Sequence, residues 1–193
     1  GRIIGSRVAE KLGIPFYDRK IIELSAEKSG LAVSFVENTE QKIKNKFLHN
    51  LAFGGYYMGA DLGGMQLSLS DKLFIATCDI IRRLADEGSC VIVGRCADYV
   101  LRERKDLMSV FIHAPLEFRA QRATKVYEKE AGNMMDFVRK KDKKRASFYN
   151  YFSQNKWGDA RHYHLAVSSV YGVDFAVEVL KHAAMSFPGG SEA

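Results

Sequence analysis

Two side chains with complementary chemistry follow an apolar run in the middle of the chain. After the run Cys90–Gly94, the residues Arg95 and Asp98 stand three positions apart. A guanidinium presents a rigid fork of N–H donors that matches a phosphate, and a carboxylate accepts hydrogen bonds from an amine or a sugar hydroxyl. Gly94 would allow the sharp turn that brings both into a crevice. The spacing equally suits a salt bridge on a surface loop, so both interpretations stay open.

A dense group of basic residues lies further along the chain. Arg119 and Arg122 are three positions apart in a predicted helix and so share one face. Between positions 139 and 145, Asp142 is the one residue without a positive charge. Such a cluster repels itself unless water or an anion surrounds it, and we favour an anion site over a solvated face. The cluster consists of Arg139, Lys140, Lys141, Lys143, Lys144 and Arg145.

Aromatic residues follow this basic cluster directly. Basic groups beside aromatic rings are also typical of proteins that bind single-stranded nucleic acid, because the rings stack on bases and the cations meet the backbone. A nucleic-acid-binding module is therefore a rival interpretation of this segment. The aromatic residues concerned are Phe148, Tyr149, Tyr151, Phe152 and Trp157.

The start of the chain offers a third candidate. Gly1 and Arg2 open a predicted helix over 2–12 that ends at Gly13. This resembles the second half of a phosphate-binding loop, in which backbone N–H groups and a helix N-terminus cradle phosphates and a cation reaches the terminal ones. Arg2 would be that cation. Because the chain starts inside this helix and without Met, we expect the strand and glycines of such a loop to precede Gly1.

Other reactive residue types are expected to be structural. His162 and His164 could face one metal only on a strand, and no third ligand is nearby, so no metal ligand can be named from the sequence. His113 ends an apolar run and is expected to have a structural hydrogen bond. Cys96 is expected to be a small packing residue. The glycine-rich segment 54–64 has no Lys or Arg, which favours a flexible flap over a phosphate cradle.

The elements that must position these residues alternate between strands and helices. Short apolar runs at 90–94, 108–113 and 165–168 predict parallel strands covered on both faces. The spacing of apolar residues predicts helices over 19–29, 71–87, 115–131, 134–152 and 173–186. The pattern indicates an open parallel α/β sheet, in which ligands bind beyond the carboxyl ends of the strands. The residues just after 93, 113 and 168 are therefore expected to form the site.

Length and composition limit the class of protein. The 193 residues are 47% hydrophobic and 27% charged, which predicts one folded domain over 1–193 rather than a disordered chain. No uncharged apolar stretch is long enough for a membrane helix. The net charge of +6 suits an anionic partner, either nucleic acid or a phosphorylated small molecule. Three cysteines without a C-x-x-C spacing, and no signal peptide, favour reduced thiols in a cytoplasmic protein.

Taken in order, these segments resemble a known family. The stretches SCVIVGRCADYVL, VFIHAPLEFRAQR and DKKRASFYNYF, together with KLGIPFYD near the start, are similar to the bacterial cytidylate kinase-like family of P-loop nucleoside monophosphate kinases. The resemblance extends from Gly1 to about Leu180. GRCADYVL and HAPLEFR in this order are specific to the family, whereas Gly-Arg at the start is not.

The resemblance implies a three-layer α/β P-loop kinase fold with a helical lid, which we place at 120–157. It implies transfer of the γ-phosphoryl group of ATP to CMP or dCMP with Mg²⁺, a reaction that depends on positioning and dispersed positive charge. By position, Gly1, Arg2 and Arg119 would bind the phosphates of the nucleotide. Asp18, Arg95 and Asp98 would face the acceptor. The residues expected to act on the transferring phosphoryl group are Arg2, Arg122, Lys141, Lys144 and Arg145.

The chain departs from ordinary cytidylate kinases at the loop itself. Arg2 stands where a P-loop has Lys, and Ile3 stands where a hydroxyl would hold Mg²⁺. Relatives in the cytidylate kinase-like family share the arginine. The alternatives are a nucleotide-binding sensor without kinase activity or a kinase of another small acceptor, with the nucleic-acid-binding module third. The order of motifs at the strand ends makes nucleic acid the least favoured partner.

Overall fold

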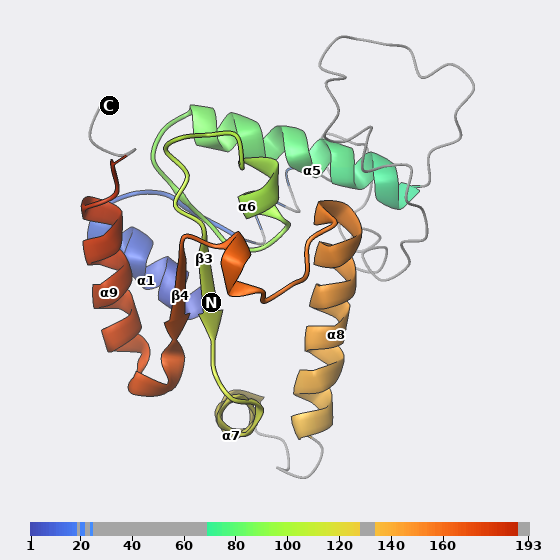
Figure 1. Ribbon diagram of the computed structural model, residues 1–193, viewed down its shortest axis with the longest axis vertical. Helices are drawn as coiled ribbons and strands as arrows, with labels where there is room; N and C mark the ends of the chain where they lie inside the picture. Colours follow the sequence, from blue (N-terminus) through green and yellow to red (C-terminus); the bar gives the residue numbers. More distant parts are fainter. Residues whose placement is uncertain (19, 22–23, 25–68, 128–133, 189–193) are drawn as a thin grey trace.

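The computed structural model describes residues 1–18, 20–21, 24, 69–127 and 134–188, and its elements alternate between helices and strands as an α/β protein (Figure 1). The predicted helix over 19–29 is described only at 20, 21 and 24, which are helical, and the expected flap at 54–64 lies outside the described residues. The elements are α1 (Arg2–Leu12), β1 (Phe16–Tyr17), α5 (Leu69–Asp86), β2 (Val91–Ile92), α6 (Ala97–Val100), β3 (Val110–His113), α7 (Leu116–Tyr127), α8 (Met134–Ser153), η2 (Ala160–His162), β4 (Leu165–Ser168), η3 (Ser169–Tyr171) and α9 (Val173–Met185).

The strands form two parallel pairs. Strand β1 pairs with β2, with Phe16 opposite Val91, and β3 pairs with β4, with Val110 opposite Leu165. Among the described residues no ladder joins β2 to β3, so the single sheet expected from the sequence is present here as two smaller sheets. The expected strand at 90–94 is correspondingly shorter, and its two residues are half-buried rather than covered on both faces.

Helix α1 packs against both pairs of strands and against α9. Its apolar face contributes Ile4 and Val8 to a core that includes Val167 and Val177, with Val91 and Val110 packed at its edge. The ion pairs Arg7–Asp174 and Lys11–Glu178 advance one turn together along α1 and α9, which shows that the two helices run parallel. The amino end of α1 is thereby fixed relative to the strands of both sheets.

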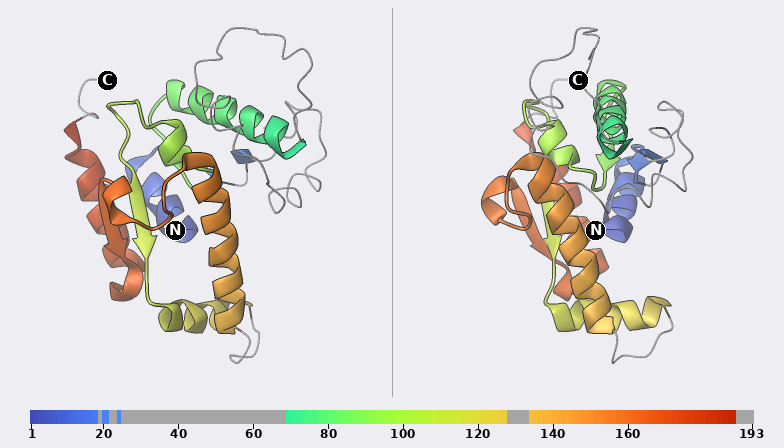
Figure 2. Two further views of the ribbon diagram at one scale, coloured as in Figure 1. Left: turned by 45° about the vertical axis from the view of Figure 1, so that its right-hand side comes forward. Right: turned by 90° about the vertical axis from the view of Figure 1, so that its right-hand side faces the viewer.

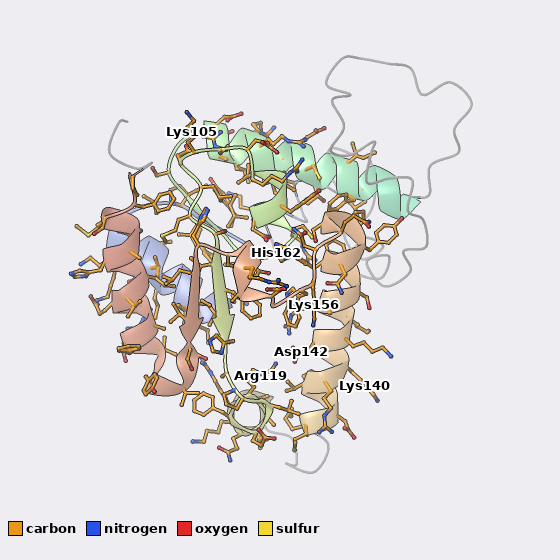
Figure 3. The ribbon with its side chains drawn as sticks, viewed as in Figure 1. Lys105, Arg119, Lys140, Asp142, Lys156 and His162 are labelled. Atoms are coloured by element: carbon orange, nitrogen blue, oxygen red, sulfur yellow. The ribbon has the colours of Figure 1, made fainter. Side chains whose placement is uncertain are left out.

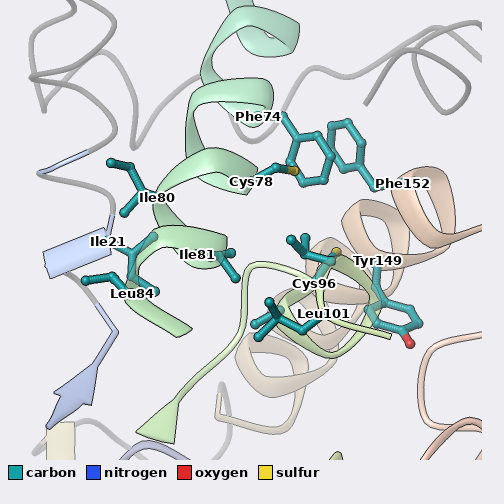
Figure 4. Close-up of a cluster of buried hydrophobic side chains, with 12 residues drawn as sticks. Ile21, Phe74, Cys78, Ile80, Ile81, Leu84, Cys96, Leu101, Tyr149 and Phe152 are labelled. Atoms are coloured by element: carbon teal, nitrogen blue, oxygen red, sulfur yellow. The ribbon is translucent and has the colours of Figure 1, made fainter. Parts of the chain in front are cut away.

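A second core holds the other half of the molecule together. Helix α5 crosses one end of the molecule, α7 lies at the opposite end, and α8 runs between them (Figures 1 and 2). The carboxyl end of α8 meets α5 where the rings of Phe152 and Phe74 stack with centroids 3.5 Å apart (Figure 4). Ile81, Leu101 and Tyr149 are buried in the same cluster. The expected lid at 120–157 therefore ends inside this core.

The helix boundaries follow from local sequence. Gly13 ends α1 with a φ of 67°, the left-handed conformation that a residue without Cβ adopts most easily. Helices α5, α7, α8 and α9 lie within a few residues of the predicted ranges, and the strand at 165–168 matches its prediction. In α1, Gly5 has a different role, because an added Cβ would lie 2.9 Å from Val93 Cγ2. Glycine at this position lets α1 approach the first sheet.

The three cysteines are free thiols, as the sequence predicted. Cys78 and Cys96 are buried and Cys90 is half-buried. Burial raises the pKa of the Cys78 thiol to about 12, so this cysteine is an unreactive packing residue. None of the helices in the described part of the chain is long and apolar enough to cross a membrane.

Candidate functional site

The turn after β2 has an unusual backbone. Gly94, Arg95 and Cys96 all have positive φ, at 83°, 60° and 57°. The N–H of Ala97 donates to the carbonyl of Gly94 over 3.1 Å, which closes a turn with Arg95 and Cys96 at its centre. A residue with a Cβ loses about 1–2 kcal/mol in this conformation, and such backbone strain tends to occur at functional sites. The turn holds Arg95 half-buried at the end of the strand.

The Asp98 carboxylate is held in place by several hydrogen bonds. Its Oδ2 accepts a hydrogen bond of 2.7 Å from the hydroxyl of Tyr149, which lies on α8. Burial raises the pKa of the Asp98 carboxyl above its ordinary value. The Tyr149 hydroxyl, the backbone N–H groups of Asp98 and Tyr99, and the charge of His162 act in the opposite direction and favour the carboxylate. The predicted acceptor loop is thus joined to α8.

A second carboxylate joins α7 to α8. Asp142 Oδ2 accepts from Nη1 of Arg119, and its Oδ1 accepts from Nη1 of Arg145 over 3.2 Å. Arg119 also donates from Nε to the carbonyl of Ala114, just after β3, over 2.9 Å. Figure 3 shows Arg119 and Asp142 in the space between the two helices. One carboxylate therefore orients two of the arginines that the sequence analysis selected.

The amino end of α1 lies near two of the arginines that the sequence analysis selected. The guanidiniums of Arg122, on α7, and Arg145, on α8, are within electrostatic range of Gly1. A helix N-terminus carries partial positive charge of its own and attracts anions. Gly1, Arg122 and Arg145 are therefore gathered in one electropositive region.

Arg2 and Asp18 form an ion pair between Nε and Oδ2. The Arg2 side chain is 72% exposed and that of Asp18 20% exposed, so the carboxylate is held in place while most of the guanidinium faces water. The sequence analysis placed Arg2 with the nucleotide phosphates and Asp18 with the acceptor. Their contact brings these two expected regions together at the end of α1.

The basic cluster over 139–145 does not act as one patch. Lys141 lies with its Nζ 5.5 Å from the ring centroid of Phe137, and Arg139 pairs with Asp136 over 3.1 Å. Lys140 points outward from α8 (Figure 3). Helical periodicity places Lys144 about 100° around α8 from Arg145 and on the exposed side. The structure thus brings Arg145 to the arginines of α7, but it does not bring Lys141 there.

The aromatic residues after this cluster are part of the core. Tyr149 and Phe152 are buried, and Phe148, Tyr151 and Trp157 pack against the same cluster. They do not form an exposed row of rings for stacking on bases, which removes the main support for the nucleic-acid interpretation.

Two of the histidines that the sequence analysis considered, His113 and His164, lie in structural contacts. His164 accepts a hydrogen bond at Nδ1 from the backbone N–H of Ser109 over 3.1 Å and packs against Phe187. The carbonyl of His113 accepts from the Ser169 hydroxyl over 3.2 Å. Within the described ranges, no three His, Cys, Asp or Glu residues gather as metal ligands.

Sequence reasoning missed three residues of this region. Asp142 looked like an interruption of the basic cluster, Tyr149 was counted among the aromatic residues after it, and Tyr163 was not singled out. A signal was present for two of them, because Asp142, Arg145 and Tyr149 are spaced i, i+3 and i+7 and so lie on one helical face. Tyr163 comes from a separate segment, and its role depends on the folded chain.

Comparison with known proteins identifies the family and a related fold. The sequence profile of the cytidylate kinase-like family matches residues 1–171, and the chain belongs to this family. A crystal structure of an uncharacterized protein from Eubacterium ventriosum ATCC 27560 has the same fold, with a TM-score of 0.67 and 22% identity, over 96% of this chain and 92% of that chain. No curated protein matches the sequence. The family associates the chain with kinase chemistry on nucleotides.

Proposed function

We propose that this protein is an ATP-dependent nucleoside monophosphate kinase that transfers the γ-phosphoryl group of ATP to CMP or dCMP. The observation that carries the proposal is the arginine cluster at the junction of α7 and α8, where Asp142 pairs with both Arg119 and Arg145. Arg122 and Arg145 also lie within electrostatic range of the amino end of α1. Phosphoryl transfer needs positive charge on several sides of the group in flight, and residues from one element alone could not provide this.

Each part of the region has a role in this reaction. A phosphate oxygen of the acceptor forms a bond to the γ-phosphorus while the bond from that phosphorus to the oxygen of ADP breaks. Arg122 and Arg145 stabilise the charge that spreads over the equatorial oxygens. Asp142 holds Arg119 and Arg145 in fixed orientations, which reduces the reorganisation needed when the nucleotide binds. Arg95 and Asp98 bind the acceptor.

A magnesium ion suits the residues at this site when the phosphates supply most of its ligands. Mg²⁺ keeps several waters and uses one or two carboxylates together with substrate phosphates. Asp18 is the carboxylate beside the start of α1, where it contacts Arg2. When bound, the ion would neutralise charge on the transferring phosphate. We also propose a three-layer P-loop architecture, a single domain and a lid within 120–157.

The proposal is tested by turnover of the full-length gene product with radiolabelled ATP, Mg²⁺ and a panel of nucleoside monophosphates. We expect labelled CDP or dCDP and little product from the purine nucleotides. The matched comparison is Arg145→Ala against Lys140→Ala, since both remove a cation from α8 but only Arg145 reaches the start of α1. Arg145→Ala should lower kcat at least about a hundredfold, as removal of a group that stabilises the transition state does, and Lys140→Ala should not.

Two outcomes would favour the alternatives. ATP binding by calorimetry without transfer to any monophosphate, in protein that binds ATP normally, would indicate a nucleotide sensor or a kinase of another acceptor. Salt-dependent binding to single-stranded oligonucleotides that is lost with Lys141, Lys144 and Arg145 changed to Ala would indicate a nucleic-acid-binding module.

A further inference from the structure

Two segments that are distant in sequence meet at the hydroxyl of Tyr149. The Asp98 carboxylate accepts a hydrogen bond from this hydroxyl over 2.7 Å, and the Tyr163 ring lies beside the Tyr149 ring with centroids 6.4 Å apart. A tyrosine hydroxyl has one proton, and an ionised carboxylate can only accept. The Tyr149 hydroxyl is therefore the donor, and its one proton is used toward Asp98.

The hydrogen bond between Tyr149 and Asp98 connects helix α8 to the acceptor loop after β2. Asp98 lies just after the turn that carries Arg95, and Tyr149 lies one helical turn after Arg145 on the same face of α8. Tyr149 is only 6% exposed and its ring packs in the core, so its hydroxyl has little freedom to turn elsewhere. A rotation of α8 that moved Arg145 would therefore also break the bond to Asp98.

We propose that Tyr149 is a positioning residue, which orients the Asp98 carboxylate for the acceptor nucleotide and fixes α8 to the acceptor loop. The proposal rests on the proposed function for the identity of the ligand, but the hydrogen bond itself does not depend on it. Tyr149 acts on the acceptor through Asp98. Effects on acceptor binding should therefore be smaller for a change at Tyr149 than for a change at Asp98.

The electrostatic surroundings of Asp98 support this role. Burial raises the pKa of its carboxyl, whereas the Tyr149 hydrogen bond lowers it and so favours the charged form. Titratable groups near Asp98 are His162 in η2 and Tyr163, and Cys96 is near Tyr163. Burial and the bond to Asp98 raise the pKa of Tyr149 itself, so it stays protonated and remains a donor.

The first test is a titration that does not depend on activity. Carbon-detected NMR of the Asp98 carboxyl should give a titration midpoint about one pH unit or more higher in Tyr149→Phe than in the wild type, because a charge-assisted hydrogen bond is lost. The phenylalanine keeps the buried ring, so the fold is retained. Because the His162 side chain lies near Asp98, the comparison is repeated with His162→Gln in both proteins, and the difference should persist. An unchanged Asp98 midpoint would show that the Tyr149 hydroxyl does not act on the Asp98 carboxyl, which would overturn the proposal.

The second test separates acceptor binding from the rest of turnover. In Tyr149→Phe, KM for CMP should rise about tenfold or more at mildly acidic pH and recover at higher pH, with KM for ATP unchanged. Tyr171→Phe is the matched control, because it removes the hydroxyl of a residue that is 75% exposed.

The two arms distinguish the two proposals. If the Asp98 midpoint rises in Tyr149→Phe while the pH dependence of KM for CMP stays that of the wild type, the positioning role is overturned. If the wild type neither binds nor phosphorylates any monophosphate, the proposed function fails, and this appears before any variant is compared. The NMR titration then still tests whether the Tyr149 hydroxyl acts on the Asp98 carboxyl.

Discussion

At the scale of single residues, the site depends on two carboxylates that each hold other groups in place. Asp142 orients Arg119 and Arg145, and Asp98 receives the hydroxyl of Tyr149. Neither carboxylate is a nucleophile in the proposed reaction. Their contribution is to reduce the freedom of cations and donors around a phosphate, which is how an enzyme lowers the barrier to phosphoryl transfer.

We expect Asp142→Asn to reduce activity much more than stability. The ion pairs of Asp142 are partly exposed, so their loss should lower the free energy of unfolding by only about 1 kcal/mol. The two arginines would lose their shared orientation, and kcat should fall about tenfold or more. Urea denaturation and turnover of the same samples measure both effects.

Asp136→Asn is the matched control for this change. Asp136 and Arg139 form another i, i+3 pair on α8, with an N–O distance of 3.1 Å against 3.2 Å for Asp142 and Arg145. This pair is exposed and both of its residues belong to α8, so its loss should leave kcat at the wild-type value. Equal losses of activity in the two variants would contradict the orienting role of Asp142.

Asp98→Asn should make the protein relatively more stable as the pH rises. The pKa of the Asp98 carboxyl is raised in the folded state, so the folded chain holds its proton more tightly than the unfolded chain does. Stability contributed by this group is therefore present at low pH and is lost as the pH rises through the folded pKa. Asparagine cannot ionise and avoids that loss. The difference in unfolding free energy, variant minus wild type, should grow between about pH 4 and pH 7.

Urea denaturation at a series of pH values measures this difference. A difference that decreased with pH would mean that the ionised carboxylate stabilises the fold, against the burial that we describe. The same variant should bind CMP weakly at every pH, because the charge that the acceptor requires is absent.

At the scale of helices and strands, the position of α1 is the feature on which the site depends most. Its first residues provide one side of the electropositive region, and its packing against the strands fixes where that region lies. The close approach at Gly5 shows how tightly this is determined, since no Cβ fits between α1 and Val93.

Gly5→Ala should destabilise the protein although alanine is the better helix former. Alanine gains about 1 kcal/mol of helix propensity over glycine. An added Cβ would nevertheless lie 2.9 Å from Val93 Cγ2 and 3.3 Å from Phe16 Cε2, and overpacking of this kind costs about 1–3 kcal/mol. Thermal and urea denaturation measure the net loss.

Ser6→Ala is the control in the same helix, because Ser6 is exposed. It should be neutral or slightly stabilising, since alanine has the higher helix propensity. A Gly5→Ala variant at least as stable as Ser6→Ala would contradict the close packing of α1 on the first sheet.

The elements were easier to predict from the sequence than the contacts between them. Helix periodicity and glycine stops gave α1, α5, α8 and α9 because their apolar faces are long and regular. The strands at Phe16–Tyr17 and Val91–Ile92 were poorly defined, since a two-residue ladder depends on its partner strand and not on its own composition. Among the site residues, Arg145 was found from charge density, and its i, i+3 spacing from Asp142 was visible in the sequence. The second pair of Asp142, with Arg119, could be recognised only once α7 lay beside α8.

At the scale of the whole molecule, the basic residues have different surroundings, and only some of them lie at the candidate site. On α8, Arg139 pairs with Asp136 and Lys141 lies over the ring of Phe137, while Arg145 pairs with Asp142, the carboxylate that also binds Arg119 of α7. The net charge of +6 therefore says less about function than the arrangement of a few arginines from separate elements. The two cores and the junction between α7 and α8 keep those elements in register.

The most direct test of this account is a double-mutant cycle on Arg122 and Arg145, measured as kcat/KM for phosphoryl transfer to CMP. If both guanidiniums act on the same phosphoryl group, each alanine variant should lose at least about a hundredfold, and the double variant should lose clearly less than the product of the two. A double variant whose loss equals that product would show that the two arginines act independently. That result would contradict their convergence on one phosphate.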